Sequence, residues 1–539
     1  MKIYGQLVDI HNRDVYPAAL TFFDGKITEV ERVDSAPDIF ILPGLTDAHI
    51  HIESSMVTPG AFAMTAVKHG TCNVVSDPHE IANVLGMRGV DFMLNDAEKV
   101  PLNFFFGAPS CVPATDFESN GAILNSDNVD QLLKRKEIHY LSEMMNFPGV
   151  INKDPEVLKK IEYAKNKGKP VDGHAPGLSG DSLKRYVAAG ISTDHECCSM
   201  DEALEKISLG MKILIREGSA AKNLNSLKDL YNYYPEMVML CSDDLHPEML
   251  EKRHINKLIA GLISEVFNIY DVIRSATINP SNHYKLNAGL LRPEDKADFI
   301  LVDSLDKMNI IETWINGQKV YSEGRVLFNY KAAEALNNFN CLPLSEKDML
   351  VRNRNCKIRV ISANEGELLT GEEYFTPGVS EFIIPDIGSD VLKIVVKDRY
   401  KDLAPSIGFI KGFGLKRGAF ASSIAHDSHN IIAVGTNDTD IVNAINEIVI
   451  MKGGLSVCSA GEKKSLKLDI GGIMTTRSCE EIAADYDDLN KLTTSLGCTM
   501  KAPFMTLSFM ALLVIPDLKI GDRGLFDVRK FEQVSLFVQ

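Results

Sequence analysis

The stretch Leu42-Pro-Gly-Leu-Thr-Asp-Ala-His-Ile-His-Ile-Glu-Ser-Ser55 decides how the rest of the chain is interpreted. It predicts a short apolar strand over Ile39 to Leu42 that runs into His49-Ile50-His51. Side chains of a strand alternate between its two faces, so His49 and His51 should point to the same face. Two neighbouring neutral imidazoles are typical ligands of a borderline divalent metal. For a lone His-x-His pair, two polar histidines on a solvated strand would be the simpler interpretation.

Length, charge and cysteine usage exclude several classes of protein. A chain of 539 residues is too long for one ordinary core, so we expect two or three domains. The net charge of −16 and the lack of a basic face disfavour a nucleic-acid partner. No apolar run of about 18 residues could span a membrane, and the N-terminus has no apolar signal core. The ten cysteines form no Cys-x-x-Cys pair, so a reducing cytoplasm is the expected location.

Strand-like segments alternate with helix-period segments through the first half of the chain. The strand-like segments are Phe40–Leu42, Cys72–Ser76, Asn103–Gly107, Tyr140–Ser142, Pro170–Asp172, Ile191–Thr193, Lys212–Ile215 and Val238–Cys241. This order predicts an α/β fold with a closed, TIM-like (β/α)8 barrel over residues 41–290. A doubly wound open sheet is the alternative, but no Gly-x-Gly-x-x-Gly follows the first strand.

Two further domains are expected around the barrel. Short alternating segments predict a small β-module in two parts, residues 1–40 and residues 291–340, which together would form a split β-sandwich. Each part contains a hairpin signal, Asp24-Gly25 in the first and Asn316-Gly317 in the second. Residues 341–539 are richer in Gly and β-branched residues and predict a C-terminal α+β domain, with helices over Asp440–Met451 and Cys479–Gly497.

Barrel enzymes carry their chemistry where the strands end. Six potential metal ligands fall at predicted strand ends, namely His49, His51, Glu143, His174, His195 and Asp243. Any one of them alone could be a helix cap or a hydrogen-bonded loop residue. All six at strand ends by chance is improbable, so we predict a shared metal centre on the barrel rim.

The predicted ligands also indicate a reaction class. A divalent ion lowers the pKa of bound water toward neutrality and makes hydroxide available. Two ions can share that hydroxide if a carboxylate bridges them, and Glu143 is the candidate bridge. Asp243 is the candidate proton acceptor, which would take the proton during attack and pass it on. Hydrolytic attack on a polarised carbon is therefore expected.

Several long motifs carry a resemblance to a known family. The motif around His49 and His51 resembles the first-strand motif of the amidohydrolase superfamily, and its extension to Ser55 is similar to the bacterial adenine deaminases. Further similar motifs are Asp77-Pro-His-Glu-Ile-Ala-Asn83, Pro109-Ser-Cys-Val-Pro-Ala-Thr115, Met145-Asn-Phe-Pro-Gly149, Gly173-His-Ala-Pro-Gly177, Ile215-Arg-Glu-Gly-Ser219, Ala425-His-Asp-Ser-His-Asn430 and Ala502-Pro-Phe-Met505. The resemblance covers nearly the whole chain. One departure is Arg253-His254-Ile255-Asn256, where the family pattern has Gly-His-Ile-Asp.

The resemblance implies conversion of adenine and water to hypoxanthine and ammonia, a step of purine salvage, with the same six ligands. It implies two divalent ions as cofactors, Mn²⁺ or Fe²⁺ before Zn²⁺. The expected partners are a small-molecule purine substrate and further copies of the chain in a homo-oligomer, dimer or larger, with no nucleic acid and no membrane. The candidate purine contacts are His79, Glu80, Glu217, Asp244, His426, Asp427 and His429. For His79 and Glu80, an accessory metal site and helix capping are the alternatives to a purine contact, and Arg216 is expected to brace the barrel rim.

Three competing functions stay open at this point. An N6-substituted adenine could be the substrate within the same chemistry. A two-metal cyclic-amide hydrolase on the same barrel predicts a lysine at the end of the fourth strand, and none stands beside Glu143. A catalytically silent scaffold predicts lost ligands, whereas all six are present.

Overall fold

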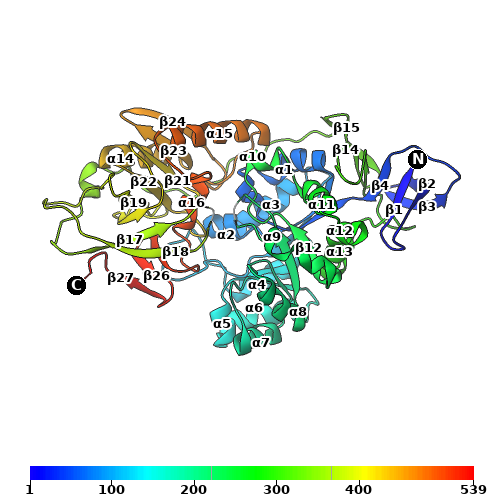
Figure 1. Ribbon diagram of the computed structural model, residues 1–539, viewed down its shortest axis with the longest axis horizontal. Helices are drawn as coiled ribbons and strands as arrows, with labels where there is room; N and C mark the ends of the chain where they lie inside the picture. Colours follow the sequence, from blue (N-terminus) through cyan, green and yellow to red (C-terminus); the bar gives the residue numbers. More distant parts are fainter. Residues whose placement is uncertain (220, 366, 539) are drawn as a thin grey trace. The chain divides into compact units, whose positions relative to one another are not determined.

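The computed structural model describes residues 1–219, 221–365 and 367–538 (Figure 1). The chain divides into two compact units. Unit 1 contains Met1–His79, Asp91–Ser110 and Asn125–Ala333, and unit 2 contains Glu80–Val90, Cys111–Leu124 and the described part of Glu334–Gln539. Two short segments from within residues 41–290 therefore group with the C-terminal residues.

Unit 1 contains eight parallel strands in two sheets, with the orders β5-β6-β7-β8-β9 and β10-β11-β12. They are β5 (Leu45–Ile50), β6 (Thr71–Ser76), β7 (Asn103–Ala108), β8 (Ile138–Met144), β9 (Val171–Gly173), β10 (Thr193–Asp194), β11 (Lys212–Arg216) and β12 (Val238–Cys241). At one seam between the sheets, the Ser192 N–H donates to the Val171 carbonyl at 3.0 Å. At the other seam, the Asp243 N–H donates to the His49 carbonyl at 2.9 Å. The ends of β12 and β5 are therefore neighbours.

Helices follow most of these strands, and α6 illustrates which sequence features make such a segment helical. The Asp154 side chain caps its N-terminus, Pro155 occupies the first turn, and Val157, Ile161 and Ala164 bury one face. The helices and 3₁₀ turns between residues 52 and 284 are η1 (Ile52–Ser55), α1 (Pro59–Ala66), η2 (Val67–His69), α2 (His79–Leu85), α3 (Met87–Ala97), α4 (Ser126–Leu133), α5 (Phe147–Ile151), α6 (Pro155–Asn166), α7 (Gly180–Ala189), α8 (Met200–Ser208), α9 (Leu224–Leu227), η3 (Lys228–Asn232), η4 (Pro235–Met237), α10 (Pro247–Leu250), α11 (Ile255–Ser264), α12 (Ile269–Ser275) and α13 (Ile278–Tyr284).

The first barrel strand lies later in the chain than the sequence predicted. Phe40–Pro43 forms β4 of a different sheet, where it pairs with β1 (Lys2–Asp9) and β13 (Phe299–Val302). The chain crosses between the sheets at Gly44, where a Cβ atom would lie 2.4 Å from Cys72 Sγ. The apolar composition continues across this crossing, so the prediction of Phe40–Leu42 as the first barrel strand was wrong.

That other sheet joins the two ends of unit 1, in the order β16-β15-β14-β13-β4-β1-β2-β3. Its remaining strands are β2 (Asp14–Phe23), β3 (Lys26–Arg32), β14 (Ile310–Ile315), β15 (Gln318–Ser322) and β16 (Arg325–Val326). Both predicted hairpin turns are confirmed. The φ angles are 49° at Asp24, 74° at Gly25, 50° at Asn316 and 70° at Gly317, as a two-residue turn with two positive φ angles requires.

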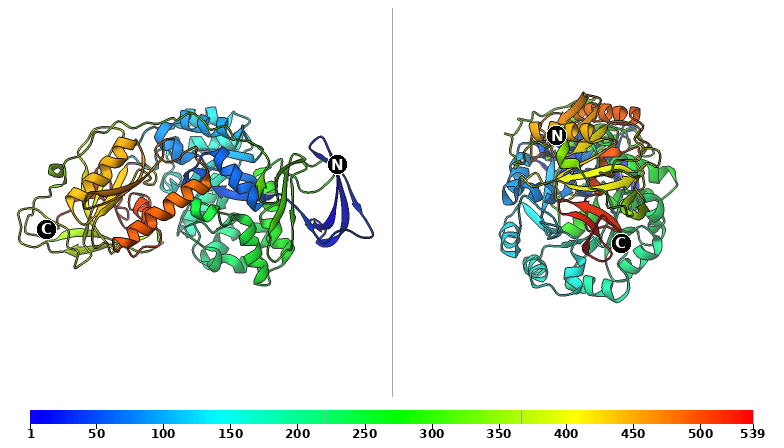
Figure 2. Two further views of the ribbon diagram at one scale, coloured as in Figure 1. Left: turned by 90° about the horizontal axis from the view of Figure 1, so that it is seen from above. Right: turned by 90° about the vertical axis from the view of Figure 1, so that its left-hand side faces the viewer.

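Unit 2 is built on an eight-stranded sheet in the order β18-β17-β20-β19-β22-β21-β23-β24. Its strands are drawn in yellow-green to orange in Figure 2. Helix α14 (Asp438–Met451) buries Ile441, Ile445 and Ile448 in a core shared with this sheet. The two helices predicted near residues 440 and 479 are confirmed as α14 and α15. The remaining elements are η5 (Glu346–Met349), β17 (Ile358–Ala363), β18 (Thr370–Phe375), β19 (Leu392–Lys397), β20 (Ser406–Lys411), β21 (Ala419–Ser422), β22 (Ile431–Gly435), β23 (Gly454–Ser459), β24 (Glu462–Lys467), α15 (Cys479–Ser495), α16 (Pro503–Phe509), β25 (Leu518–Gly521), β26 (Gly524–Asp527) and β27 (Glu532–Val534). Among the described residues, no helix has the length and apolar composition needed to cross a membrane.

A buried arginine of unit 2 contacts a main-chain carbonyl and two aromatic rings. Arg399 is fully buried, and its Nη2 donates to the Gly471 carbonyl at 2.6 Å. Its guanidinium lies 5.5 Å from the ring centre of Phe339 and 5.2 Å from that of Tyr400. Gly472 has a φ of +69°, and a Cβ atom there would lie 2.3 Å from Arg399 Nη1. Only glycine fits beside this guanidinium.

Gly472→Ala should therefore lower the free energy of unfolding by about 2 kcal/mol more than Gly461→Ala does. Gly461 is the matched control, because it also has a positive φ of +87° but nothing within 4 Å of the added Cβ. Both variants carry the backbone strain of about 1 kcal/mol, so the difference reports the overpacking against Arg399. Urea unfolding of the full chain measures it. Equal losses in the two variants would show that the pocket around Arg399 relaxes.

Candidate metal centre

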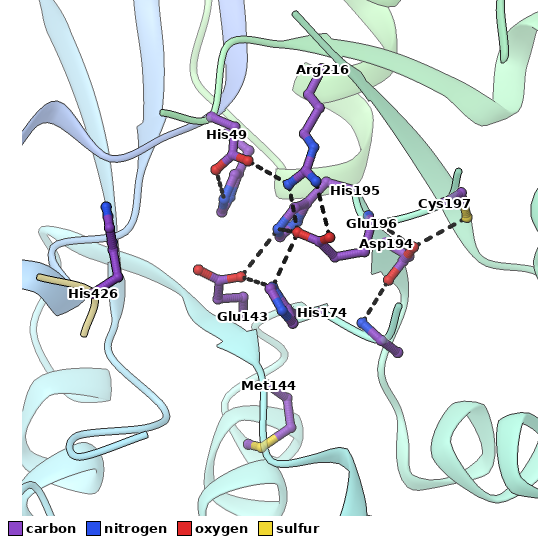
Figure 3. Close-up of polar contacts among 12 residues, drawn as sticks. His49, Glu143, Met144, His174, Asp194, His195, Glu196, Cys197, Arg216 and His426 are labelled. Carbon is purple, nitrogen blue, oxygen red and sulfur yellow. Dashed lines mark hydrogen bonds and ion pairs between the residues drawn. The ribbon is translucent and has the colours of Figure 1, made fainter. Parts of the chain in front are cut away.

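The structure brings all six predicted ligands together in unit 1, where the barrel strands end; Figure 3 labels four of them. The Nε2 atoms of His49 and His51 lie 3.2 Å apart. Asp243 Oδ1 lies 3.3 Å from His51 Nε2 and 3.6 Å from His49 Nε2. These three residues form one group of donors.

Glu143 connects this group to a second one. Its Oε1 lies 3.2 Å from His51 Nε2. Its Oε2 lies 2.8 Å from His174 Nδ1 and 3.2 Å from His195 Nε2. Ser110 Oγ donates to the Glu143 carbonyl at 2.5 Å, which fixes the end of β8. The position of Glu143 between the two groups is the one expected of a bridging carboxylate.

Burial and charge make the centre suited to cations. All six side chains are buried, and His49 is fully buried. Burial raises the pKa of Glu143, but the charges and hydrogen bonds of His174 and His195 outweigh it and hold the pKa well below its usual value. Burial likewise raises the pKa of Asp243, and the charge of Arg216 with hydrogen bonds from His49 and His51 lowers it well below its usual value. Two buried carboxylates are thus held ionised among four imidazoles.

Two carboxylates near the centre were not selected from the sequence. Glu196 Oε1 lies 3.4 Å from His195 Nε2 and 3.5 Å from His174 Nδ1, and the carboxylate pairs with Arg216. Asp77 Oδ2 lies 2.9 Å from His79 Nδ1. Asp77 directly follows β6, and Glu196 stands two residues after β10, so the rule that found the six ligands would have found these two as well.

Comparison with known proteins identifies the family. The model of the amidohydrolase family matches residues 40–320, and that of the adenine deaminase C-terminal domain matches residues 367–532. The chain is 53% identical to the adenine deaminase of Methanosarcina barkeri, over 100% of both chains. The chain belongs to the adenine deaminase family. It is also 48% identical to the adenine deaminase of Salinibacter ruber, over 100% of this chain and 99% of that one.

Membership of this family makes the chain a hydrolase of the amidohydrolase superfamily, whose fold is of the TIM-barrel type. Among solved structures, a β-aspartyl dipeptidase from Fervidobacterium islandicum aligns with a TM-score of 0.47 and 16% identity, covering 61% of this chain and 100% of its own. The amidohydrolase family implies a divalent metal ion. The nitrogen and oxygen donors gathered in this chain fit such an ion. Imidazole nitrogens 3.2 Å apart need a proton or a cation between them, and four buried imidazoles beside two buried carboxylates are a donor set that suits a divalent ion.

Three of the predicted purine contacts lie in unit 1. His79 Nδ1 faces Asp77 and lies 3.4 Å from Glu143 Oε1, so His79 belongs to the centre. Asp244 Oδ1 accepts a hydrogen bond from Ser54 Oγ at 2.5 Å. Glu217 is paired with Lys222 at 3.1 Å and lies 3.8 Å from an arginine nitrogen, that of Arg253. The Glu217 carboxylate thus pairs with the side chains of Lys222 and Arg253, and no contact with the six predicted ligands is seen among the described residues.

The other four predicted contacts group together in unit 2. Glu80 Oε1 lies 2.5 Å from His426 Nδ1, and its Oε2 accepts from His429 Nε2. Asp427 is buried in the same segment and raises, together with burial, the pKa of Glu118. The motif at residues 425–430 thus binds a carboxylate from the segment Glu80–Val90.

The departure from the family pattern at Arg253-His254-Ile255-Asn256 lies away from the six ligands. His254 Nε2 lies 2.9 Å from Asp47 Oδ2, and Asp47 Oδ1 accepts the Ser242 N–H at 3.0 Å. Asn256 Nδ2 donates to the Met308 carbonyl at 3.1 Å. The asparagine therefore bonds to the main chain just before β14, and the histidine is linked through Asp47 to Ser242, the residue before Asp243.

Proposed function

We propose that this chain hydrolyses adenine to hypoxanthine and ammonia at a centre of two divalent metal ions, Mn²⁺ or Fe²⁺ before Zn²⁺, within purine salvage. The observation that carries the proposal is the convergence of Glu143 and five other buried predicted ligands in a chain 53% identical to a named adenine deaminase over its full length. We further propose a cytoplasmic location and a homo-oligomeric state, dimer or larger. No nucleic acid or membrane takes part.

The proposal extends to the domains. Residues 41–290 would form a complete (β/α)8 barrel, residues 1–40 with residues 291–340 a split β-sandwich, and residues 341–539 a C-terminal α+β domain. The hydrogen bond from the Asp243 N–H to the His49 carbonyl supports closure of the barrel. The pairing of β4 with both β1 and β13 supports the split module.

The two groups of donors suggest which residues would hold each ion. His49, His51, Asp243 and Oε1 of Glu143 would hold one, and His174, His195 and Oε2 of Glu143 the other. When bound there, divalent ions lower the pKa of water to about 7, which supplies the nucleophile at neutral pH.

The residues of the chain would then handle the protons. Asp243 Oδ1 would accept a proton from the attacking water as the bond from oxygen to C6 of the purine forms. It would return that proton to the amino nitrogen as the C6–N bond breaks and ammonia leaves. The assignment of His79, Glu80, Glu217, Asp244, His426, Asp427 and His429 to purine contacts stays a prediction.

The test is reconstitution of the metal-free full chain with Mn²⁺, Fe²⁺ or Zn²⁺, followed by assays for hypoxanthine and ammonia. We expect full activity on adenine at two ions per chain and loss of activity with a chelator, because hydrolysis near neutral pH depends on the metal. Activity saturating at one ion would contradict the two-ion assignment. N6-methyladenine and a cyclic amide are the comparison substrates. Hypoxanthine from N6-methyladenine but not from adenine would move the proposal to the N6-substituted base, and turnover of the amide alone would favour the cyclic-amide hydrolase.

A further inference from the structure

Arg216, at the end of β11, joins two buried carboxylates of the centre (Figure 3). Its Nη1 donates to Glu196 Oε1 at 2.5 Å and to Asp243 Oδ2 at 2.6 Å, and its Nη2 donates to Glu196 Oε2 at 3.0 Å. The side chain is 5% exposed. The planar guanidinium therefore holds both oxygens of Glu196 and one oxygen of Asp243 in fixed directions.

We propose that Arg216, held in turn by Glu196, is a positioning residue that orients Asp243 for proton transfer. With Oδ2 bonded to the guanidinium, Oδ1 of Asp243 is left to face His51 at 3.3 Å and His49 at 3.6 Å. The carboxylate cannot rotate its oxygens without losing this bond. The inference rests on the proposed function, because it assigns to Asp243 the acceptance of the proton.

The main chain of the arginine is itself linked to the segment that carries His195. The Arg216 N–H donates to Asn223 Oδ1 at 2.8 Å. Asn223 Nδ2 donates to the carbonyls of His195 and Cys197, both at 3.1 Å. Asn223 thus joins the main chain of β11 to the segment after β10. Through its guanidinium, Arg216 ties His195 and Glu196 on one side to Asp243 on the other.

A purely structural brace does not need this arrangement. Buried ion pairs can often be replaced by apolar groups without loss of stability, because their desolvation cost offsets their attraction. Among the described residues, the Nε atom of Arg216 is buried with no hydrogen-bond partner, and a buried donor in that state lowers stability. Arginine instead fixes the orientation of its partners, because its planar guanidinium donates hydrogen bonds to two carboxylates at the same time.

The experiment compares Arg216→Lys and the double variant Arg216→Gln/Glu196→Gln with the wild-type holoenzyme. Lysine keeps the charge but offers one compact donor group in place of the fork. The double variant removes both charges of the Arg216–Glu196 pair, so Glu196 is not left ionised and unpaired. The matched control is Arg13→Lys, which alters another arginine fork of unit 1, on Asp271. For each protein, kcat, KM, metal content and the thermal midpoint are measured, together with the visible absorption of the Co²⁺-loaded chain.

We expect both Arg216 variants to lose about 10- to 100-fold in kcat, as is typical when an outer partner of a metal ligand is removed. KM, metal content and the thermal midpoint should change little, and the Co²⁺ absorption should shift because Asp243 reorients. Arg13→Lys should change none of these readouts. Wild-type kcat and an unshifted Co²⁺ spectrum in the variants would overturn the proposal, as would a kcat loss that only follows loss of metal or stability. If the wild type itself did not deaminate adenine, the proposed function would fail, whereas the Co²⁺ spectrum would still report whether Arg216 orients Asp243.

Discussion

Replacing Asp243 by asparagine should lower kcat for adenine by about 10²- to 10⁴-fold, the usual contribution of a general acid–base group. Asparagine keeps the shape of the side chain but cannot accept the proton of the attacking water. The fold should tolerate it, because Asp243 has a φ of +54° and asparagine adopts this left-handed region readily. Turnover should fall further than metal content does.

The measurement is steady-state kinetics on protein loaded with two ions, with metal analysis of the same sample. Asp24→Asn is the matched control, since it makes the same substitution at a φ of +49° in the exposed β2–β3 hairpin. The control should keep wild-type kcat. Retention of wild-type kcat by Asp243→Asn would remove this residue from proton transfer and leave it at most a ligand.

Glu143→Gln should weaken binding of the second metal ion by at least about 10- to 100-fold. Glutamine keeps the size of the side chain but loses the negative charge and one oxygen donor, so it cannot face both groups of histidines as the carboxylate does. The group formed by His49, His51 and Asp243 is untouched, and one ion should therefore remain. Calorimetric titration of the metal-free chain with Mn²⁺ measures both binding events.

Glu251→Gln is the control for this titration, because Glu251 belongs to unit 1 and bonds to Thr65 and Lys68. It should bind two ions as the wild type does. Two tightly held ions and normal turnover in Glu143→Gln would mean that another residue of the rim connects the ions. The two variants thus separate the roles, because Asp243→Asn should lose rate before metal and Glu143→Gln should lose metal first.

Local patterns in the sequence were enough to place the ligands. Period-two alternation put His49 and His51 on one face, and the rule that barrel chemistry lies at strand ends selected the other four, all of which converge. The same patterns misplaced the first strand, because the run from Phe40 to Leu45 is continuously apolar while the chain changes sheets at Gly44. A hydrophobic run reports burial but does not report which sheet the strand joins.

Contacts over long distances in the sequence could not be predicted in the same way. The sequence suggested that Arg216 braces the rim, yet its partners lie 20 and 27 positions away, and many carboxylates near strand ends were available. Likewise, no periodicity indicates that Glu80 pairs with histidines beyond residue 420. Such pairings depend on the three-dimensional arrangement of strands and loops that are far apart in the sequence. Local patterns in a single sequence do not contain this information.

The grouping of Glu80–Val90 with the C-terminal residues has a consequence for synthesis on the ribosome. Glu80 precedes its partner His426 by 346 positions. At a synthesis rate of about 5–20 residues per second, roughly 17–70 s pass between translation of Glu80 and translation of its histidine partners. During that interval, the segment has no native place to fold into. A gene shortened to the first 340 codons would make this condition permanent, so unit 2 is not an appendage that can be trimmed from the message without consequence for the residues translated first.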